Sequence, residues 1–159
     1  MDTDAHLAAA IAQARIGLAE GGIPIGAALV VDDVVFATGR NRRVQYGSAI
    51  HHGETNALEM AGRLPASTYA RATMYTTLSP CQMCSGAILL YGIPRVIIGE
   101  NRTFMGAEDL LRSHGVEVVV VDSAECRTMM AQFIAEHPSL WNEDIGEPDE
   151  PGAASGAAP

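Results

Sequence analysis

The 159-residue sequence predicts an α/β fold, a three-layer α/β/α sandwich around a central mixed sheet. Strand-like segments alternate with helical segments along most of the chain, which is typical of α/β domains. Two neighbouring strand-like segments near the N-terminus are separated by Asp32-Asp33 and indicate one hairpin. Residues 116–121 are apolar on both faces except at Glu117, which is typical of a strand with helices on both sides.

The first half of the chain is expected to hold a helix, a hairpin, a polar loop and a second helix. Leu7, Ile11, Ala14 and Leu18 recur at helical spacing and predict an amphipathic helix that ends at Gly21. The apolar segments on either side of the hairpin turn predict its two strands. The expected bounds are 4–20 for the first helix, 25–31 and 34–38 for the strands, 39–48 for the loop and 52–63 for the second helix.

The second half is expected to alternate strands and helices and then to lose order. Ser123 is a suitable N-cap for the last predicted helix. Residues 146–159 are rich in Gly, Pro, Ala and acidic residues, which predicts a disordered tail after a single domain over residues 1–145. The expected bounds are 72–78, 95–99 and 116–121 for strands, and 81–92 and 124–137 for helices.

Composition excludes several classes of protein. All ten basic residues are Arg, so no P-loop or Schiff-base lysine exists. The formal net charge is −9, so nucleic acid is not an expected partner. No apolar run approaches the roughly 18 residues of a membrane helix, so no membrane partner is expected. The acidic start does not resemble a signal peptide, and three cysteines suit a reducing, cytoplasmic location.

Two short motifs supply the side chains of a candidate zinc site. The first is His52-Gly53-Glu54, and the second is Pro80-Cys81-Gln82-Met83-Cys84. Structural zinc sites fill four positions with protein ligands, whereas catalytic sites keep one position open for water. His52, Cys81 and Cys84 as ligands, with Glu54 left free, predict one catalytic Zn²⁺ ion per chain.

Glu54 is expected to move protons and not to bind the metal. Zinc lowers the pKa of a bound water toward about 7. A carboxylate beside it can then carry a proton to a ring nitrogen and to a departing amine. Cys81 and Cys84 are three positions apart, so both sulfurs face one way on a helix, for which Pro80 suits the first turn and Ser79 the cap.

Two other interpretations of the cysteines remain open at this point. A lone C-x-x-C is often a redox pair, and a structural zinc site would need a fourth ligand. Cys126, His51 and His114 are the nearest candidates for that ligand, but none belongs to a second paired motif. The two motifs together favour a catalytic zinc site over a non-enzymatic zinc or redox module.

Several longer stretches resemble the cytidine-deaminase-like superfamily, and within it the fungal-type cytosine deaminases most closely. The resemblance extends from about Gly21 to Glu147 and is most specific at the C-terminal ending. It implies a compact homodimer with a small buried pocket for a free base. The stretches are Glu20-Gly21-Gly22-Ile23-Pro24-Ile25-Gly26, His52-Gly53-Glu54, Tyr75-Thr76-Thr77-Leu78-Ser79-Pro80-Cys81, Tyr91-Gly92-Ile93-Pro94-Arg95 and Trp141-Asn142-Glu143-Asp144-Ile145-Gly146-Glu147.

The resemblance also implies roles for residues around the zinc site. Asn41 and the Gly53 backbone would hold the carbonyl edge of the base, and Asp144 would accept hydrogen bonds from its amine edge. Phe104 and Trp141 would enclose the ring, as a flat heterocycle requires. Apart from the resemblance, residues 139–145 are a better candidate for a lid than the tail, because they would have to move for product to leave. The apolar walls would be Ile25, Leu78 and Ile145.

The resemblance implies hydrolysis of cytosine to uracil and ammonia, in support of pyrimidine salvage. Arg40, Arg42 and Arg43 make the loop around Asn41 basic, and residues 105–107 depart from the fungal pattern. These differences leave open guanine, an oxidised or modified base, isocytosine or an amino-triazine as the ring. A tRNA adenosine deaminase shares the zinc motif, but the acidic composition opposes it.

Overall fold

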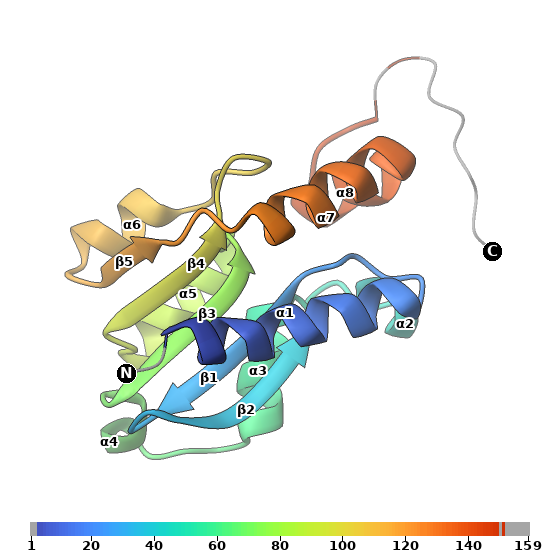
Figure 1. The fold of residues 1–159 in the computed structure, drawn as a ribbon. Helices are drawn as coiled ribbons and strands as arrows, with labels where there is room; N and C mark the ends of the chain where they lie inside the picture. Colours follow the sequence, from blue (N-terminus) through green and yellow to red (C-terminus); the bar gives the residue numbers. More distant parts are fainter. Residues whose placement is uncertain (1–2, 150, 152–159) are drawn as a thin grey trace.

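The computed structural model describes residues 3–149 and 151, and it shows a five-stranded sheet with helices on both faces (Figure 1). The strands are β1 (Gly26–Val31), β2 (Val34–Arg40), β3 (Ala72–Leu78), β4 (Arg95–Glu100) and β5 (Glu117–Val120). The helices are α1 (Thr3–Ala19), α2 (Arg43–Tyr46), α3 (Gly53–Ala61), α4 (Ala66–Tyr69), α5 (Gln82–Tyr91), α6 (Glu108–Ser113), α7 (Ala124–Glu136) and α8 (Pro138–Ile145).

The sheet is mixed, as predicted. Its strand order is β2-β1-β3-β4-β5. β1 is antiparallel to β2 and to β3, whereas β3, β4 and β5 run parallel to one another. Parallel neighbours place the carboxyl ends of β3 and β4 side by side, and those ends lead into the segments that build the site.

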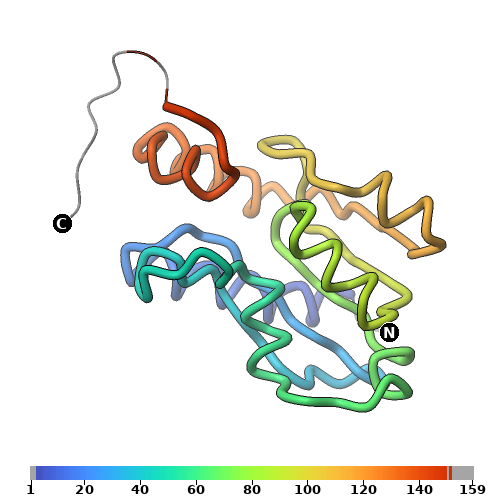
Figure 2. The backbone as a smooth tube through the Cα atoms, turned by 180° about the vertical axis from the view of Figure 1, so that it is seen from behind, coloured from blue at the N-terminus to red at the C-terminus, as the bar shows by residue number. Residues whose placement is uncertain are grey.

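Alternate residues of the strands face two separate hydrophobic clusters, which confirms the three-layer prediction. Leu29 and Met74 pack with α3, α5 and α6 on one face of the sheet. Ala28 and Tyr75 pack with α1 and α7 on the other face. Figure 2 shows the molecule from behind, with α3 and α5 on the same face of the sheet. A third cluster, around Trp141, joins α7 and α8 to the end of the sheet that bears the site.

The hairpin and one glycine bring α3 close to the sheet. Asp32 and Asp33 both have positive φ, at 51° and 66°, which is the two-residue turn expected from the sequence. A Cβ on Gly39 would lie only 2.2 Å from the backbone nitrogen of Ala57 in α3. Only glycine therefore allows this approach, which fixes the position of the helix that begins beside His52.

Some expected bounds are wrong. The short helices α2, α4, α6 and α8 lie outside the expected bounds, and β2 continues to Arg40 into the predicted polar loop. Cys81, and not Ser79 as expected, is the N-cap of α5. The Ser79 hydroxyl instead donates a hydrogen bond to the Glu108 carboxylate. β5 is a half-buried edge strand that pairs only with β4 and does not have the full burial of an inner strand.

The last helix ends where the tail was predicted to begin. Gly146 follows α8 with φ of 70°, and its N–H caps the helix end. Residues 150 and 152–159, most of the predicted disordered tail, lie outside the described residues. No helix in the described part of the chain is long and apolar enough to cross a membrane.

Candidate active site

The two zinc motifs meet at the starts of α3 and α5. His52 is the N-cap of α3, and Cys81 is the N-cap of α5, with Cys84 in the first turn of that helix. The ligand atoms of these three residues all lie within 4.8 Å of one another. Within the described residues, no other group of three His, Cys, Asp or Glu side chains gathers so closely, and His51, His114 and Cys126 stay outside it.

The arrangement fits a zinc ion. Zn–S and Zn–N bonds of about 2.3 and 2.0 Å place tetrahedral ligand atoms roughly 3.5 to 3.8 Å apart. The Nδ1 atom of His52 lies 3.4 Å from the Cys81 sulfur, close to that spacing. Three protein ligands leave a fourth position open, which is typical of a catalytic zinc site.

The three ligands differ in how readily each gives up its proton to bind a metal. A hydrogen bond from the Cys84 thiol, with a further contribution from His52, lowers the pKa of Cys81 to about 4. The pKa of Cys84 is raised well above its usual value because its thiol gives that bond and is buried. Burial alone lowers the pKa of His52, but contact with Cys81 and the charge of Asp144 raise it overall. Cys81 is therefore the sulfur that is poised as a thiolate, the form that binds zinc.

Glu54 lies beside the ligands without belonging to their group. It is the second residue of α3 and is buried, and the Thr76 hydroxyl donates a 2.8 Å hydrogen bond to its Oε1. Burial raises the pKa of Glu54, and the nearby Cys81 raises it further. A carboxyl group with a raised pKa next to a metal site can both accept and return a proton.

A small inner cavity with an empty volume of about 290 Å³ opens next to the metal ligands. Most of the predicted substrate residues line it, although they come from four separate segments of the chain. Phe104 and Trp141 meet edge to face with ring centroids 5.6 Å apart. The lining residues are Ile25, His52, Glu54, Leu78, Ser79, Cys81, Phe104, Trp141, Asp144 and Ile145.

Asp144 is the most connected polar residue of the cavity. Its Oδ1 accepts a 2.8 Å hydrogen bond from the Asn41 side chain and lies 3.4 Å from the Arg43 guanidinium. The same oxygen lies 3.5 Å from Nε2 of His52, the ring nitrogen that faces away from Cys81. Asp144 can thus orient the metal-binding imidazole as well as face a substrate.

Three predicted residues lie behind the cavity wall and do not line it. Asn41 is fully buried, and its side-chain oxygen accepts a hydrogen bond from the Arg43 backbone. Gly53 is buried as the first residue of α3, in contact range of Ile25. Cys84 is buried below the metal site.

The sequence interpretation missed the roles of Thr76, Ser79 and Arg43. Thr76 holds Glu54, Ser79 lines the inner cavity, and Arg43 contacts Asp144 and, at 3.7 Å, Glu143. Strand alternation places Thr76 on the same face as Leu78, which is the one local signal for it. The contacts of Arg43 join residues about a hundred positions apart, so no local pattern could indicate them.

A wider outer pocket, with an empty volume of about 960 Å³, lies on the solvent side of the inner cavity. The inner cavity and the outer pocket share walls. The loop that carries Phe104 and helix α8 therefore lie between the inner cavity and the outer pocket. The shared residues are His52, Cys81, Phe104, Asp144 and Ile145.

Comparisons with known proteins agree with this geometry. The cytosine deaminase of Candida albicans (strain SC5314 / ATCC MYA-2876) is 56% identical over 147 residues, which cover 92% of this chain and 98% of that protein. A tRNA-specific adenosine deaminase of Streptococcus pyogenes serotype M18 (strain MGAS8232) is 34% identical over 137 residues, covering 80% and 86% of the two chains.

Solved structures show the same fold. A structure from studies of tRNA:A34 deaminases superposes with a TM-score of 0.67 and 28% identity, covering 79% of this chain and 98% of that one. A guanine deaminase from Nitrosomonas europaea superposes with a TM-score of 0.65 over 84% and 85% of the chains, but its 21% identity indicates likeness of fold alone.

The sequence model of one protein family matches residues 2–100, a span that contains His52, Glu54, Cys81 and Cys84. That family is described as the cytidine and deoxycytidylate deaminase zinc-binding region. The match covers well over half of the chain, and the three-ligand group lies inside it. The chain therefore belongs to the zinc-dependent cytidine and deoxycytidylate deaminase family.

Proposed function

We propose that the protein is a zinc-dependent hydrolase that converts free cytosine and water to uracil and ammonia. The observation that carries the proposal is the inner cavity, which joins a three-ligand metal site, a protonatable carboxyl group and two aromatic walls in one small space. The space between the metal ligands and the two aromatic side chains is small, which favours a single ring over a larger ligand. The identity of 56% to a cytosine deaminase supports cytosine as that ring.

His52, Cys81 and Cys84 would hold the zinc ion. When bound, zinc acts as a Lewis acid that activates water at neutral pH. Glu54 would take a proton from the water as its oxygen bonds to the amine-bearing ring carbon, and deliver that proton to the adjacent ring nitrogen. It would then take the proton of the new hydroxyl group and pass it to the amino group, so that ammonia leaves as the C–N bond breaks and the C=O bond of uracil forms. The Thr76 hydroxyl keeps the carboxyl group of Glu54 in place for each transfer.

Recognition of the ring would fall to the remaining predicted residues. Asp144 would accept hydrogen bonds from the amine edge, and Asn41 with the Gly53 backbone would hold the carbonyl edge. Asn41 donates one side-chain N–H to Asp144, and the second N–H of its amide would donate to the carbonyl oxygen of the base. Phe104 and Trp141 would enclose the ring from two sides.

The zinc-loaded protein should release ammonia from cytosine and not from cytidine, because the ribose would not fit beside Phe104 and Trp141 in the inner cavity. The assay panel is cytosine, cytidine, isocytosine, guanine, 8-oxoguanine, adenine, an amino-triazine and tRNA. Fast turnover of another ring with little turnover of cytosine would keep the chemistry and overturn the substrate. The net charge of −9 opposes tRNA binding, so a shift of tRNA in a low-salt gel would contradict this proposal.

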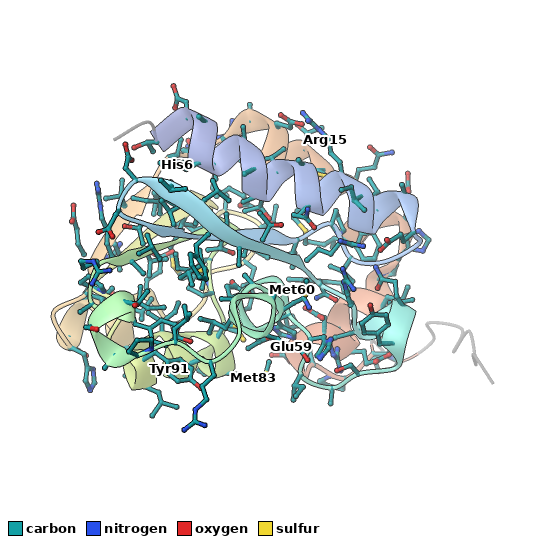
Figure 3. The ribbon with its side chains drawn as sticks, turned by 90° about the horizontal axis from the view of Figure 1, so that it is seen from below. His6, Arg15, Glu59, Met60, Met83 and Tyr91 are labelled. Carbon is teal, nitrogen blue, oxygen red and sulfur yellow. The ribbon has the colours of Figure 1, made fainter. Side chains whose placement is uncertain are left out.

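The proposed enzyme is a homodimer that associates through α3 and α5. Met60, Leu90 and Tyr91 are exposed on these two neighbouring helices, and Met83 extends the apolar surface (Figure 3). Exposed apolar patches of this kind commonly mark protein–protein interfaces. A groove of about 840 Å³ between the helices could receive side chains of the second copy.

Light scattering on the wild type and on a Met60→Glu, Leu90→Glu variant tests the interface. The wild type should be a dimer and the variant a monomer, whereas Val34→Glu, at an exposed position of the edge strand β2 and outside α3 and α5, should leave the dimer intact. A monomeric wild type at micromolar concentration would contradict the proposal. We also propose a cytoplasmic location, since the cysteine ligands need a reducing environment. The proposed biological role is pyrimidine salvage.

A further inference from the structure

Two buried acidic residues bracket the loop that carries Phe104. Residues 101–107 form this loop, which joins β4 to α6. Glu100 is the last residue of β4 and Glu108 the first residue of α6, and both side chains are buried. Neither residue lines the inner cavity or the outer pocket, so the reaction itself does not account for them.

Glu100 shapes the first half of the loop. Its Oε2 accepts hydrogen bonds from the backbone nitrogens of Arg102, at 2.7 Å, and Thr103, at 3.0 Å. The Thr103 hydroxyl donates to the other carboxylate oxygen. These bonds close a tight turn immediately before Phe104.

Glu108 joins the loop to the turn that precedes the metal ligand Cys81. Its Oε1 accepts a 2.8 Å hydrogen bond from the Ser79 hydroxyl and a 3.1 Å bond from the Asn101 side chain. Its Oε2 pairs with Arg112 at 3.0 Å. One carboxylate oxygen therefore contacts both the start of the loop and the end of β3.

The end of the loop rests directly on the same turn. The Gly106 backbone nitrogen donates a 2.9 Å hydrogen bond to the Ser79 hydroxyl oxygen, and the Ala107 nitrogen donates a 2.8 Å bond to the Pro80 carbonyl. A Cβ on Gly106 would lie 2.0 Å from that carbonyl oxygen, so only glycine fits there. Both ends of the loop are thus fixed to residues 79–80.

Polar contacts hold most of this loop, and Phe104 is the one residue of it that packs against the hydrophobic cluster around Trp141. Met105 is 60% exposed, and Phe104, the other large apolar residue of the loop, is directed to Trp141 and the inner cavity. A buried carboxylate is costly unless several donors satisfy it. The donors around Glu108 are satisfied together only when the loop lies against the turn, so the contact selects one loop position.

We propose that Glu108 is a positioning residue, which acts through Ser79 to hold the Phe104 loop against the turn that carries Cys81. This contact holds the aromatic wall of the cavity at a fixed position relative to the metal ligands. The consequence for catalysis rests on the proposed deamination of cytosine. Loss of the Glu108 acceptor should release Phe104 and weaken binding of the ring, while the metal site and Glu54 stay intact.

The test uses three full-length, zinc-loaded variants. Glu108→Ala removes the acceptor for Ser79, whereas Glu108→Gln keeps an oxygen that can accept the same bond. Asp109→Ala is the matched control, because Asp109 occupies the next position of α6 and its side chain is fully exposed. Each variant is characterised by its KM and kcat for cytosine, its zinc content, and the quenching of Trp141 fluorescence by acrylamide. Trp141 is the single tryptophan of the chain.

Glu108→Ala should raise KM about tenfold or more, since small displacements at a site can cost up to 10²-fold. It should retain stoichiometric zinc and make Trp141 more accessible to acrylamide, because Phe104 no longer covers that ring. Glu108→Gln should recover most of the wild-type KM and quenching. Asp109→Ala should match the wild type in every measurement.

If Glu108→Ala showed the same KM and the same Trp141 quenching as the wild type, the proposal would be overturned. Loss of zinc in step with activity would also overturn it, because the network would then serve the metal site and not the loop. If Glu108→Ala does not fold, Ser79→Ala removes the same link more mildly and is judged by the same criteria. A wild type inactive on cytosine would overturn the proposed function, while Trp141 quenching would still decide the role of Glu108.

Discussion

The metal-binding part and the ring-enclosing part of the site are built in different ways. His52, Glu54, Cys81 and Cys84 come from two short segments at the starts of α3 and α5, both packed on the central sheet. The ring-enclosing residues come from the 101–107 loop and from α8, which lie beyond the carboxyl ends of the strands. The first part rests on the central hydrophobic core, whereas the second rests on the smaller cluster around Trp141 and on the polar contacts of the 101–107 loop.

This difference separates the chemistry from the choice of substrate. A change in a polar contact such as Asn41 to Asp144 can move a wall of the cavity without disturbing α3 or α5. Relatives that match 92% and 80% of this chain are named as a cytosine deaminase and a tRNA-specific adenosine deaminase, so their names differ in the substrate. We expect mutations in the metal part to abolish activity and mutations in the ring part to redistribute it.

The largest effect is expected from loss of a metal ligand. Cys84→Ala should lose stoichiometric zinc and all measurable turnover, because two ligands cannot hold the ion as three do. Metal analysis and ammonia release measure both. Cys126→Ala is the matched control, since Cys126 is also buried but lies among α7 residues outside the ligand group, and it should retain zinc.

The next largest effect is expected at Glu54. Glu54→Gln should lower kcat by about 10⁴-fold, the upper end for general acid–base catalysis, because one carboxyl group serves several proton transfers. Zinc content should remain at the wild-type level, which distinguishes this variant from Cys84→Ala. Turnover within tenfold of the wild type would remove Glu54 from the mechanism.

A smaller effect is expected in the ring-enclosing part. Asp144→Asn should lower kcat/KM by about 10- to 100-fold, since it weakens contacts to His52 and Arg43 as well as to the substrate. Glu143→Gln is the control, because Glu143 lies on the same helix with an exposed side chain. Equal losses in the two variants would show that the charge of α8, and not the position of Asp144, matters.

The smallest effect is expected at the Glu20–Arg40 pair, which borders the Asn41 segment. Two hydrogen bonds from Arg40, with a further one from Gln45, lower the pKa of Glu20 to about 2, from an ordinary value of 4.5. A lowered pKa in the folded state means that the contribution to stability is present above pH 4.5 and is lost as the pH falls toward 2. Glu20→Gln should lower Tm slightly at pH 7, and the difference from the wild type should shrink below pH 4.5. A Tm difference that is constant over this range would contradict the pairing.

The metal centre could be predicted from sequence because its geometry is local. Residues at the start of a helix that lie three positions apart present their side chains on the same side in any fold. Cys81 and Cys84 therefore already indicate two ligands of one metal ion. The hairpin turn at Asp32 and Asp33 and the cap at Ser123 are local in the same sense, and the structure confirms both. The short helices α2, α4 and α6 carry no apolar period long enough to indicate them.

The sequence alone determined the reaction type, the metal ligands and the strand–helix order, because each depends on residue chemistry and short-range spacing. Only the tertiary structure decided which residues enclose the substrate space and what holds them. Asn41 and Asp144 are 103 positions apart, and Ser79 and Glu108 are 29 apart, yet each pair shares a hydrogen bond of 2.8 Å. Such contacts form only after the sheet has aligned the ends of its strands, since burial and not local preference selects the partner.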